Sequence, residues 1–203
     1  MRTIHRHLAW ALVCSAMAGT AGAQTDIRPD EWSRGTTLIG FAGVAGDSEH
    51  VGPVLGGAVG WELTRRFAIE GSGSWLDFGH SANAFAGAMK FRTRLFGRGT
   101  LDPFVEGGVG LYRAWYGADA TGIPRFHARR MGTQPVPGVG ATFTDPTLLA
   151  GGGVNIFVNR RFALRPELEA TFVLRNGRAH TVTSLGVQAV YHFEEHPVTP
   201  WRR

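Results

Sequence analysis

The sequence contains little cysteine, little charge and no long apolar run beyond its first residues. Its single cysteine, Cys14, lies in an N-terminal apolar block, so a chain cleaved after that block has neither disulfides nor cysteine metal sites. No stretch of about 18 apolar residues follows the block, which excludes a membrane-spanning helix there. Charged residues make up 18% of the chain, and the formal net charge is +5. Because this excess is mild and an exported chain seldom meets nucleic acid, we expect no nucleic-acid partner.

The first residues have the pattern of a secretory signal peptide. A basic start at Arg2 precedes an apolar block from Leu8 to Ala18, and Ala21-Gly22-Ala23 follows it. The block is shorter than the roughly 20 residues of a spanning helix, whereas small residues after a short apolar block are typical of a cleaved leader. We therefore predict a signal peptide over residues 1–23 and a polar lead over 24–34.

Glycine is abundant, with 29 residues, many of them inside apolar runs. A glycine in a helix interior costs about 1 kcal/mol relative to alanine, whereas in strands it permits curvature and close backbone approach. The composition therefore predicts an all-β chain.

The segment 56–75 is repeated, with an offset of 95 residues, as 151–170. In each copy a glycine-rich apolar strand leads to two arginines, and a second strand with alternating character follows. One set of alternate positions is apolar, and the other set is small or charged. This pattern predicts an antiparallel hairpin whose two faces differ.

Alternation along the whole chain predicts eight strands of about nine to twelve residues, longer than the five or six typical of soluble sheets. We expect them at residues 36–45, 54–63, 67–77, 83–96, 103–116, 147–158, 161–174 and 180–193. The turns near 64–65, 97–102 and 159–160 are short, whereas the connections at the other end are expected to be longer, above all 117–146. This arrangement predicts an eight-stranded antiparallel up-and-down transmembrane β-barrel over 35–193, followed by a tail over 194–203.

The orientation of the two faces decides between a membrane barrel and a soluble one. A soluble barrel would carry charge outside, but the stripe opposite the apolar one is mostly glycine, alanine and serine with few charges. Such a stripe suits a narrow lumen in which charged side chains pair. We expect Arg165 to pair with Glu167, and Arg66, Arg94 and Arg161 to be available near the short turns. The predicted lumen charge network is Glu62, Glu70, Lys90, Arg92, Glu106, Arg165, Glu167 and Glu169.

The outward stripe is expected to be apolar, because a closed sheet pairs all its backbone groups within lipid. On the first strand it contains Ile39 and Phe41, and on later strands it includes Leu55, Val59, Trp61, Ile69, Met89, Val109, Ile156, Leu164, Leu168 and Val187. Aromatic residues near both strand ends predict two interfacial girdles. Pro166 removes one ladder hydrogen bond, which favours a bulge or a sheet edge at that position.

With this leader, these strands and a last strand ending Tyr191-His192-Phe193, the chain resembles the small eight-stranded outer-membrane barrels of the OmpA and OmpX kind. The repeated hairpin, from Gly151 to Glu167 in its second copy, is familiar in that superfamily. The resemblance covers about residues 35–193. It implies a bacterial outer-membrane location, insertion by the outer-membrane assembly machinery and contact with outer-membrane lipid and lipopolysaccharide. Such proteins usually end at the last aromatic residue, whereas ten residues follow Phe193 here.

Some barrels of this size modify lipid A, which requires a nucleophile beside a base. The nearest candidates are His80-Ser81 and His180 with Ser184. Adjacent strand residues point to opposite faces, and residues four apart lie roughly 13 Å from each other. Neither pair therefore predicts a catalytic site. We expect no enzyme activity, no cofactor and no metal site.

The long segment 117–146 carries Arg125, Arg129 and Arg130, which would suit the phosphates of lipopolysaccharide, although a solvated loop is an alternative interpretation. Eight strands enclose only enough space for side chains, so we expect a plugged lumen. The resulting hypothesis is a monomeric, non-enzymatic membrane barrel with an envelope or surface-contact role. A lipid A-modifying enzyme and a secreted soluble barrel that binds an apolar ligand remain as alternatives.

Overall fold

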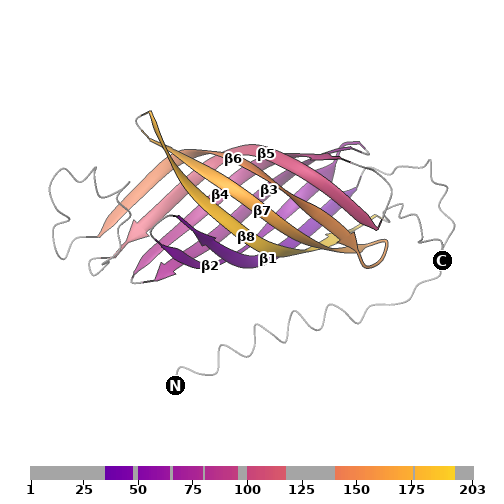
Figure 1. Cartoon of the computed structure of the whole chain (residues 1–203), viewed down its shortest axis with the longest axis horizontal. Coiled ribbons are helices and arrows are strands. Elements are labelled where there is room, and N and C mark those ends of the chain that lie inside the picture. Colours follow the sequence, from indigo (N-terminus) through magenta and orange to yellow (C-terminus); the bar gives the residue numbers. More distant parts are fainter. Residues whose placement is uncertain are drawn as a thin grey trace, which may run out of the picture.

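The computed structural model describes residues 35–47, 50–64, 66–79, 81–95, 100–117, 140–175 and 177–194. Within these residues, eight antiparallel strands form one closed barrel, each paired with its neighbours in sequence and the last paired with the first (Figure 1). The strands are β1 (Thr36–Gly46), β2 (Val51–Glu62), β3 (Phe67–Gly79), β4 (Ala82–Arg94), β5 (Leu101–Tyr116), β6 (Ala141–Phe157), β7 (Phe162–Arg175) and β8 (Arg178–His192). The described chain contains no helix that is long and apolar enough to cross a membrane.

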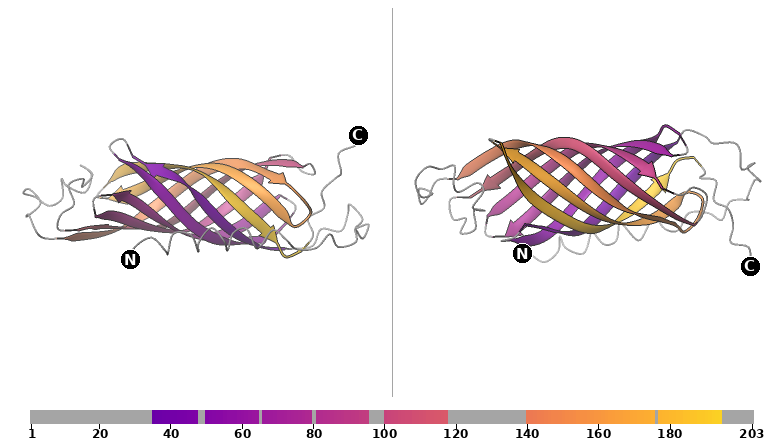
Figure 2. Two further views of the ribbon diagram at one scale, coloured as in Figure 1. Left: turned by 90° about the horizontal axis from the view of Figure 1, so that it is seen from below. Right: turned by 45° about the horizontal axis from the view of Figure 1, so that its top comes forward.

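The strands run obliquely around an elongated barrel, and its two ends differ (Figure 2). We call one of them the short-turn end: it contains the connections 63–66, 95–100 and 158–161, together with the start of β1 and the end of β8. At the other end, the loop end, the chain leaves β5 at Tyr116 and enters β6 at Ala141.

The two copies of the repeat form equivalent hairpins, β2–β3 and β6–β7. In the first turn the amide of Thr64 donates to the carbonyl of Phe67 at 3.1 Å, and in the second the amide of Asn159 donates to the carbonyl of Phe162 at 3.2 Å. The side chains of Thr64 and Asn159 in turn accept from the amides of Phe67 and Phe162, at 3.1 and 2.8 Å. A short polar side chain that bonds the backbone two or three residues ahead is typical of tight turns. The repeat therefore preserves one turn structure.

The strands at the loop end are longer than the sequence predicts. β6 begins at Ala141, so the predicted loop over 117–146 is too long at its end. Pro146 lies within β6, where it faces outward opposite Leu111, although a proline cannot donate a ladder hydrogen bond. The other connections here, 47–50, 80–81 and 176–177, are short, so the expectation of longer loops is wrong for them. Gly177, with φ of 74°, allows the last of these turns.

The orientation of the strands agrees with the predicted apolar exterior, except in β1. Ile39 is only 2% exposed and points into the lumen beside Ala58 and Val190, whereas Leu38 faces outward. Both faces of β1 carry apolar residues, so alternation alone does not define its orientation. The register with β2 and β8 does, because Leu38 pairs with Val59 and Tyr191 on the outer face. The prediction for Ile39 and Phe41 is therefore wrong.

Pro166 causes neither a bulge nor an edge. It pairs with Val187 on β8, and the β6–β7 register is the same on both sides of it, with Gly153 opposite Glu167 and Ile156 opposite Leu164. The barrel therefore continues past the proline without a shift in register.

Candidate functional site

The lumen contains the whole predicted charge network. Its eight side chains come from β2, β3, β4, β5 and β7 and all point inward, and the most exposed of them, Glu169, has a side-chain exposure of 15%. Alternation explains this arrangement, because residues of equal parity on a strand share a face.

Lys90 on β4 lies at the centre of the first group of charges. Its Nζ lies 2.8 Å from Glu106 Oε1, 3.2 Å from Glu167 Oε1 and 2.7 Å from Glu169 Oε2. Each of these three side chains offers a carboxylate oxygen within 4.8 Å of those of the other two, a spacing that a metal ion could also use. Here the lysine ammonium takes the position of the cation between them.

Two arginines form the second group. Arg92 pairs with Glu70, and its Nε lies 3.5 Å from Glu106 Oε2, so it joins this group to the first. Arg165 Nη1 lies 3.2 Å from Glu70 Oε2 and donates to Gln188 Oε1 at 3.0 Å. Glu70 is thus shared by two guanidinium groups, one from the neighbouring strand β4 and one from β7 across the lumen.

Arg165 and Glu167 attract each other, but their closest ionic contacts are with other residues. Arg165 instead donates from Nε to Asn155 at 2.7 Å and contacts Glu70, whereas Glu167 contacts Lys90. Residues two apart on a strand lie nearly 7 Å from each other, while strands on opposite walls bring long side chains together at the axis.

A third group lies at the short-turn end, and sequence reasoning identified it only in part. Arg94 pairs with Glu62, and its Nε lies 2.9 Å from Asp102 Oδ2. Asp102 was missed because it was assigned to a turn, although it has the same parity as Glu106 on β5. Arg66 and Arg161, which were also considered, are exposed.

An aromatic ring lies among these charges. The guanidinium carbons of Arg92 and Arg165 lie 4.8 and 5.3 Å from the centroid of the Phe104 ring, distances typical of cation–π contacts. Gly153 on β6 makes room for the ring, since a Cβ there would lie 3.1 Å from Phe104 Cζ and 2.3 Å from the Pro166 carbonyl oxygen.

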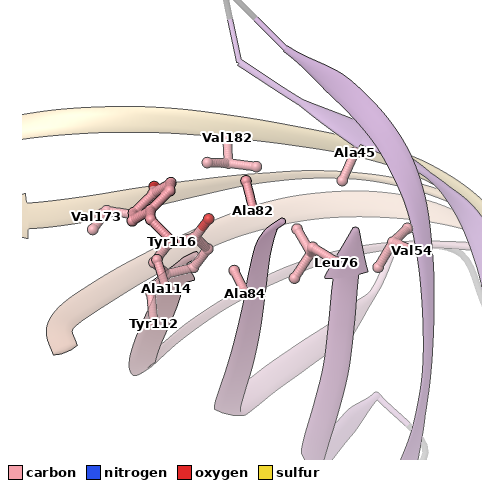
Figure 3. Packing of buried hydrophobic residues seen from close by; sticks show 10 residues of the cluster. All are labelled: Ala45, Val54, Leu76, Ala82, Ala84, Tyr112, Ala114, Tyr116, Val173 and Val182. Atoms are coloured by element: carbon pink, nitrogen blue, oxygen red, sulfur yellow. The ribbon is translucent and has the colours of Figure 1, made fainter. Parts of the chain in front are cut away.

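The half of the lumen nearer the loop end is more apolar. Small aliphatic side chains and two tyrosines from several strands fill it (Figure 3): Ala45, Val54, Leu76, Ala82, Ala84, Tyr112, Ala114, Tyr116, Val173 and Val182. An ion pair and a further polar contact that sequence reasoning did not identify lie there: Arg175 Nε is 2.6 Å from Asp145 Oδ1, and His180 Nε2 is 3.0 Å from Asp47 Oδ2.

The structure describes only some of the residues that were considered for catalysis and for lipopolysaccharide contact. His180 contacts Asp47, whereas Ser184 lines a cavity deeper in the lumen. His80, Arg125, Arg129 and Arg130 lie outside the described residues.

The exterior is apolar along the middle of the strands and toward the short-turn end, whereas Arg113, Thr144 and Thr183 are exposed on the same face toward the loop end. Met89 is 57% exposed and Val109 is 59% exposed, and many other large apolar side chains share this face. Aromatic pairs occur toward both ends, with Phe67 stacked on Phe91 at 5.4 Å and Trp75 on Trp115 at 5.5 Å between ring centroids.

A closed eight-stranded antiparallel barrel with an apolar exterior and a charged interior is the architecture of small membrane barrels. Neisserial surface protein A has this fold: its TM-score with this chain is 0.57 at 10% identity, over 79% of this chain and 97% of that chain. The N-terminal β-barrel domain of OprF from Pseudomonas aeruginosa has a TM-score of 0.53 at 14% identity, over 77% of this chain and 97% of that chain. The chain thus has the fold of the small outer-membrane barrels. No family model matches its sequence, and no curated protein does.

Proposed function

We propose that this chain is a non-enzymatic, monomeric outer-membrane β-barrel with a plugged lumen and a structural or surface-contact role in the envelope. The observation that carries the proposal is the inversion of polarity: exposed apolar side chains surround the barrel, and ion pairs fill its centre. In water such an exterior would be a very large exposed apolar patch, whereas in lipid it is the stable surface.

The interior also argues against the soluble alternative. A soluble barrel that binds an apolar ligand needs an apolar cavity, but Lys90, Arg92 and Arg165 cross this lumen with their carboxylate partners. Closure of the sheet leaves no strand edge to expose in lipid.

The remaining parts of the proposal concern residues outside the described ones. We assign residues 1–23 as the export signal, which delivers the chain to the outer-membrane assembly machinery. In this proposal the short-turn end faces the periplasm, and the segment after Tyr116 faces outward with Arg125, Arg129 and Arg130 near lipopolysaccharide phosphates. The leader and the basic segment in the sequence support these assignments.

Fractionation of cells that express the full chain tests the location. We expect the protein in the outer-membrane fraction, extractable only with detergent, and faster migration on gels when it is left unheated than after boiling. Recovery in the soluble periplasm without detergent would contradict the proposal.

Planar-bilayer recording tests the plug separately. The purified barrel should show no sustained porin-like conductance, because ion pairs cross the lumen in three groups. A large steady conductance with the ion pairs intact would refute the closed lumen but leave the membrane location standing.

A further inference from the structure

The connected ion pairs of the lumen do not balance. The carboxylates of Glu62, Glu70, Asp102, Glu106, Glu167 and Glu169 face the cationic groups of Lys90, Arg92, Arg94 and Arg165. With all six carboxylates ionised and His192, which lies 3.8 Å from Glu62, neutral, the described side chains of this network would bring six negative groups to four positive ones. A buried excess of two negative charges is costly unless something compensates for it.

The excess lies beside a cavity. Lys90 is the cation that contacts Glu167 and Glu169, and it also contacts Glu106, so three carboxylates share its charge. A cavity of about 50 Å³ adjoins this group, between the charge network and the apolar side chains toward the loop end. Such a volume holds an ion or a few water molecules, since one water needs about 10–15 Å³ by the same measure.

Glu167, which lines this cavity together with Glu169, has one carboxylate oxygen without a partner in the described part of the barrel. Glu167 is 7% exposed, and its Oε1 contacts Lys90 at 3.2 Å. Its Oε2 is buried and has no hydrogen-bond partner among the residues that the structure describes. A buried ionised oxygen without a partner is rare, because its desolvation is not repaid.

The rest of the cavity wall combines apolar residues with residues that carry a hydroxyl group. The hydroxyl-bearing residues come from three sides of the barrel: Ser74 on β3, Tyr112 on β5, and Thr171 and Ser184 on β7 and β8. Hard cations prefer oxygen ligands of this kind.

We propose that this cavity binds one monovalent metal cation, Na⁺ or K⁺, with Glu167 as the charged ligand and hydroxyl and water oxygens as the neutral ligands. A divalent ion fits less well, because the ammonium of Lys90 already occupies the position between the three carboxylates. The cation would remove part of the charge excess and satisfy the remaining oxygen of Glu167. This proposal concerns the lumen alone and does not depend on the role of the barrel in the envelope.

The full mature barrel, refolded in a zwitterionic detergent, provides the test. Its unfolding midpoint in urea is measured in NaCl, KCl, N-methylglucamine chloride and MgCl₂ at equal ionic strength. A small alkali cation should raise the midpoint relative to N-methylglucamine, which is too large for the cavity. At a concentration about ten times the dissociation constant, binding shifts the folding equilibrium about tenfold toward the folded barrel.

Glu167→Gln should abolish this dependence on the cation, because it removes the charged ligand with little change in shape. Glu62→Gln is the matched control: it removes an equally buried carboxylate that does not line the cavity, so the cation effect should persist even if the variant is less stable. Equal midpoints of the wild-type barrel in all salts, or an undiminished effect in Glu167→Gln, would overturn the proposal in favour of a protonated Glu167. Stabilisation by Mg²⁺ alone would overturn the assignment to a monovalent ion.

Discussion

The hairpins β2–β3 and β6–β7 have the same local structure but carry different charges on opposite walls of the lumen. Both turns are closed by a polar side chain, Thr64 or Asn159, that accepts from an amide three residues ahead. The inward positions differ: Glu70 on β3 corresponds to Arg165 on β7, and these two side chains meet at 3.2 Å. The two hairpins therefore share a backbone structure, and their side chains carry opposite charges at the position where they meet.

The difference extends toward the loop end. After Glu70 the inward positions of β3 are Ser72 and Ser74, whereas after Arg165 the inward positions of β7 are Glu167 and Glu169. A narrow lumen has little space for long side chains. The small Ser72 and Ser74 on β3 leave room for Glu167 and Glu169 on β7, and these two carboxylates contact Lys90 on β4. The comparison teaches that lumen packing constrains the two walls jointly.

The largest loss of stability is expected when Arg165, which joins the two hairpins, loses its charge. Arg165→Met should leave Glu70, Asn155 and Gln188 underpaired in the lumen and cost about 3–5 kcal/mol of folding free energy. Urea unfolding of the refolded barrel in lipid, followed by tryptophan fluorescence, measures this loss. A cost below about 1 kcal/mol would show that the ion pair between Arg165 and Glu70 contributes little to the stability of the barrel.

The outer face of the same hairpin should respond to charge according to depth. Leu168 lies midway along β7, so Leu168→Arg should cost about 2–4 kcal/mol in a bilayer, whereas Val158→Arg, beside the turn, should cost only about 0–1 kcal/mol. The same unfolding series in lipid vesicles measures both. Equal costs at the two positions would contradict a membrane around the barrel.

A double-mutant cycle measures how strongly Arg165 and Glu70, the equivalent positions of the two hairpins, interact. Arg165→Met should cost about 0.5–3 kcal/mol less when Glu70→Gln is already present, because the two groups interact directly. Asp145→Asn, which alters a separate ion pair with Arg175, is the control background and should leave the cost unchanged. Additive costs in the Glu70→Gln background would indicate that the two positions do not interact.

The smallest effects are expected at the turns, where the copies are alike. Thr64→Ala and Asn159→Ala each remove side-chain hydrogen bonds to the backbone and should cost about 1 kcal/mol. Unfolding midpoints of the two variants should fall by similar amounts. A large difference between them would show that the turns are not equivalent in the folded barrel.

Much of the fold follows from the sequence because alternation is a local property. On β7, Leu164 and Leu168 alternate with Arg165 and Glu167, and this pattern alone defines a strand with one apolar and one polar face. On β1 both faces are apolar, and the prediction for Ile39 was wrong because only pairing with β2 and β8 defines its orientation. The predicted strand over 147–158 starts too late, because pairing with β5 extends through Pro146 back to Ala141.

The sequence predicted which charged residues lie in the lumen, but not which of them contact each other. Parity places Lys90, Glu106 and Glu167 inside the barrel, yet their contacts join residues up to 77 positions apart. The sequence by itself determined the strands, the hairpin repeat and the segregation of apolar from charged faces, since each depends on neighbours a few residues away. Only the closed tertiary structure decided which charges meet, which buried carboxylate oxygens of the described residues lack a hydrogen-bond partner and which face of β1 points into the lumen. These outcomes depend on the shear and radius of the barrel, which no single strand encodes.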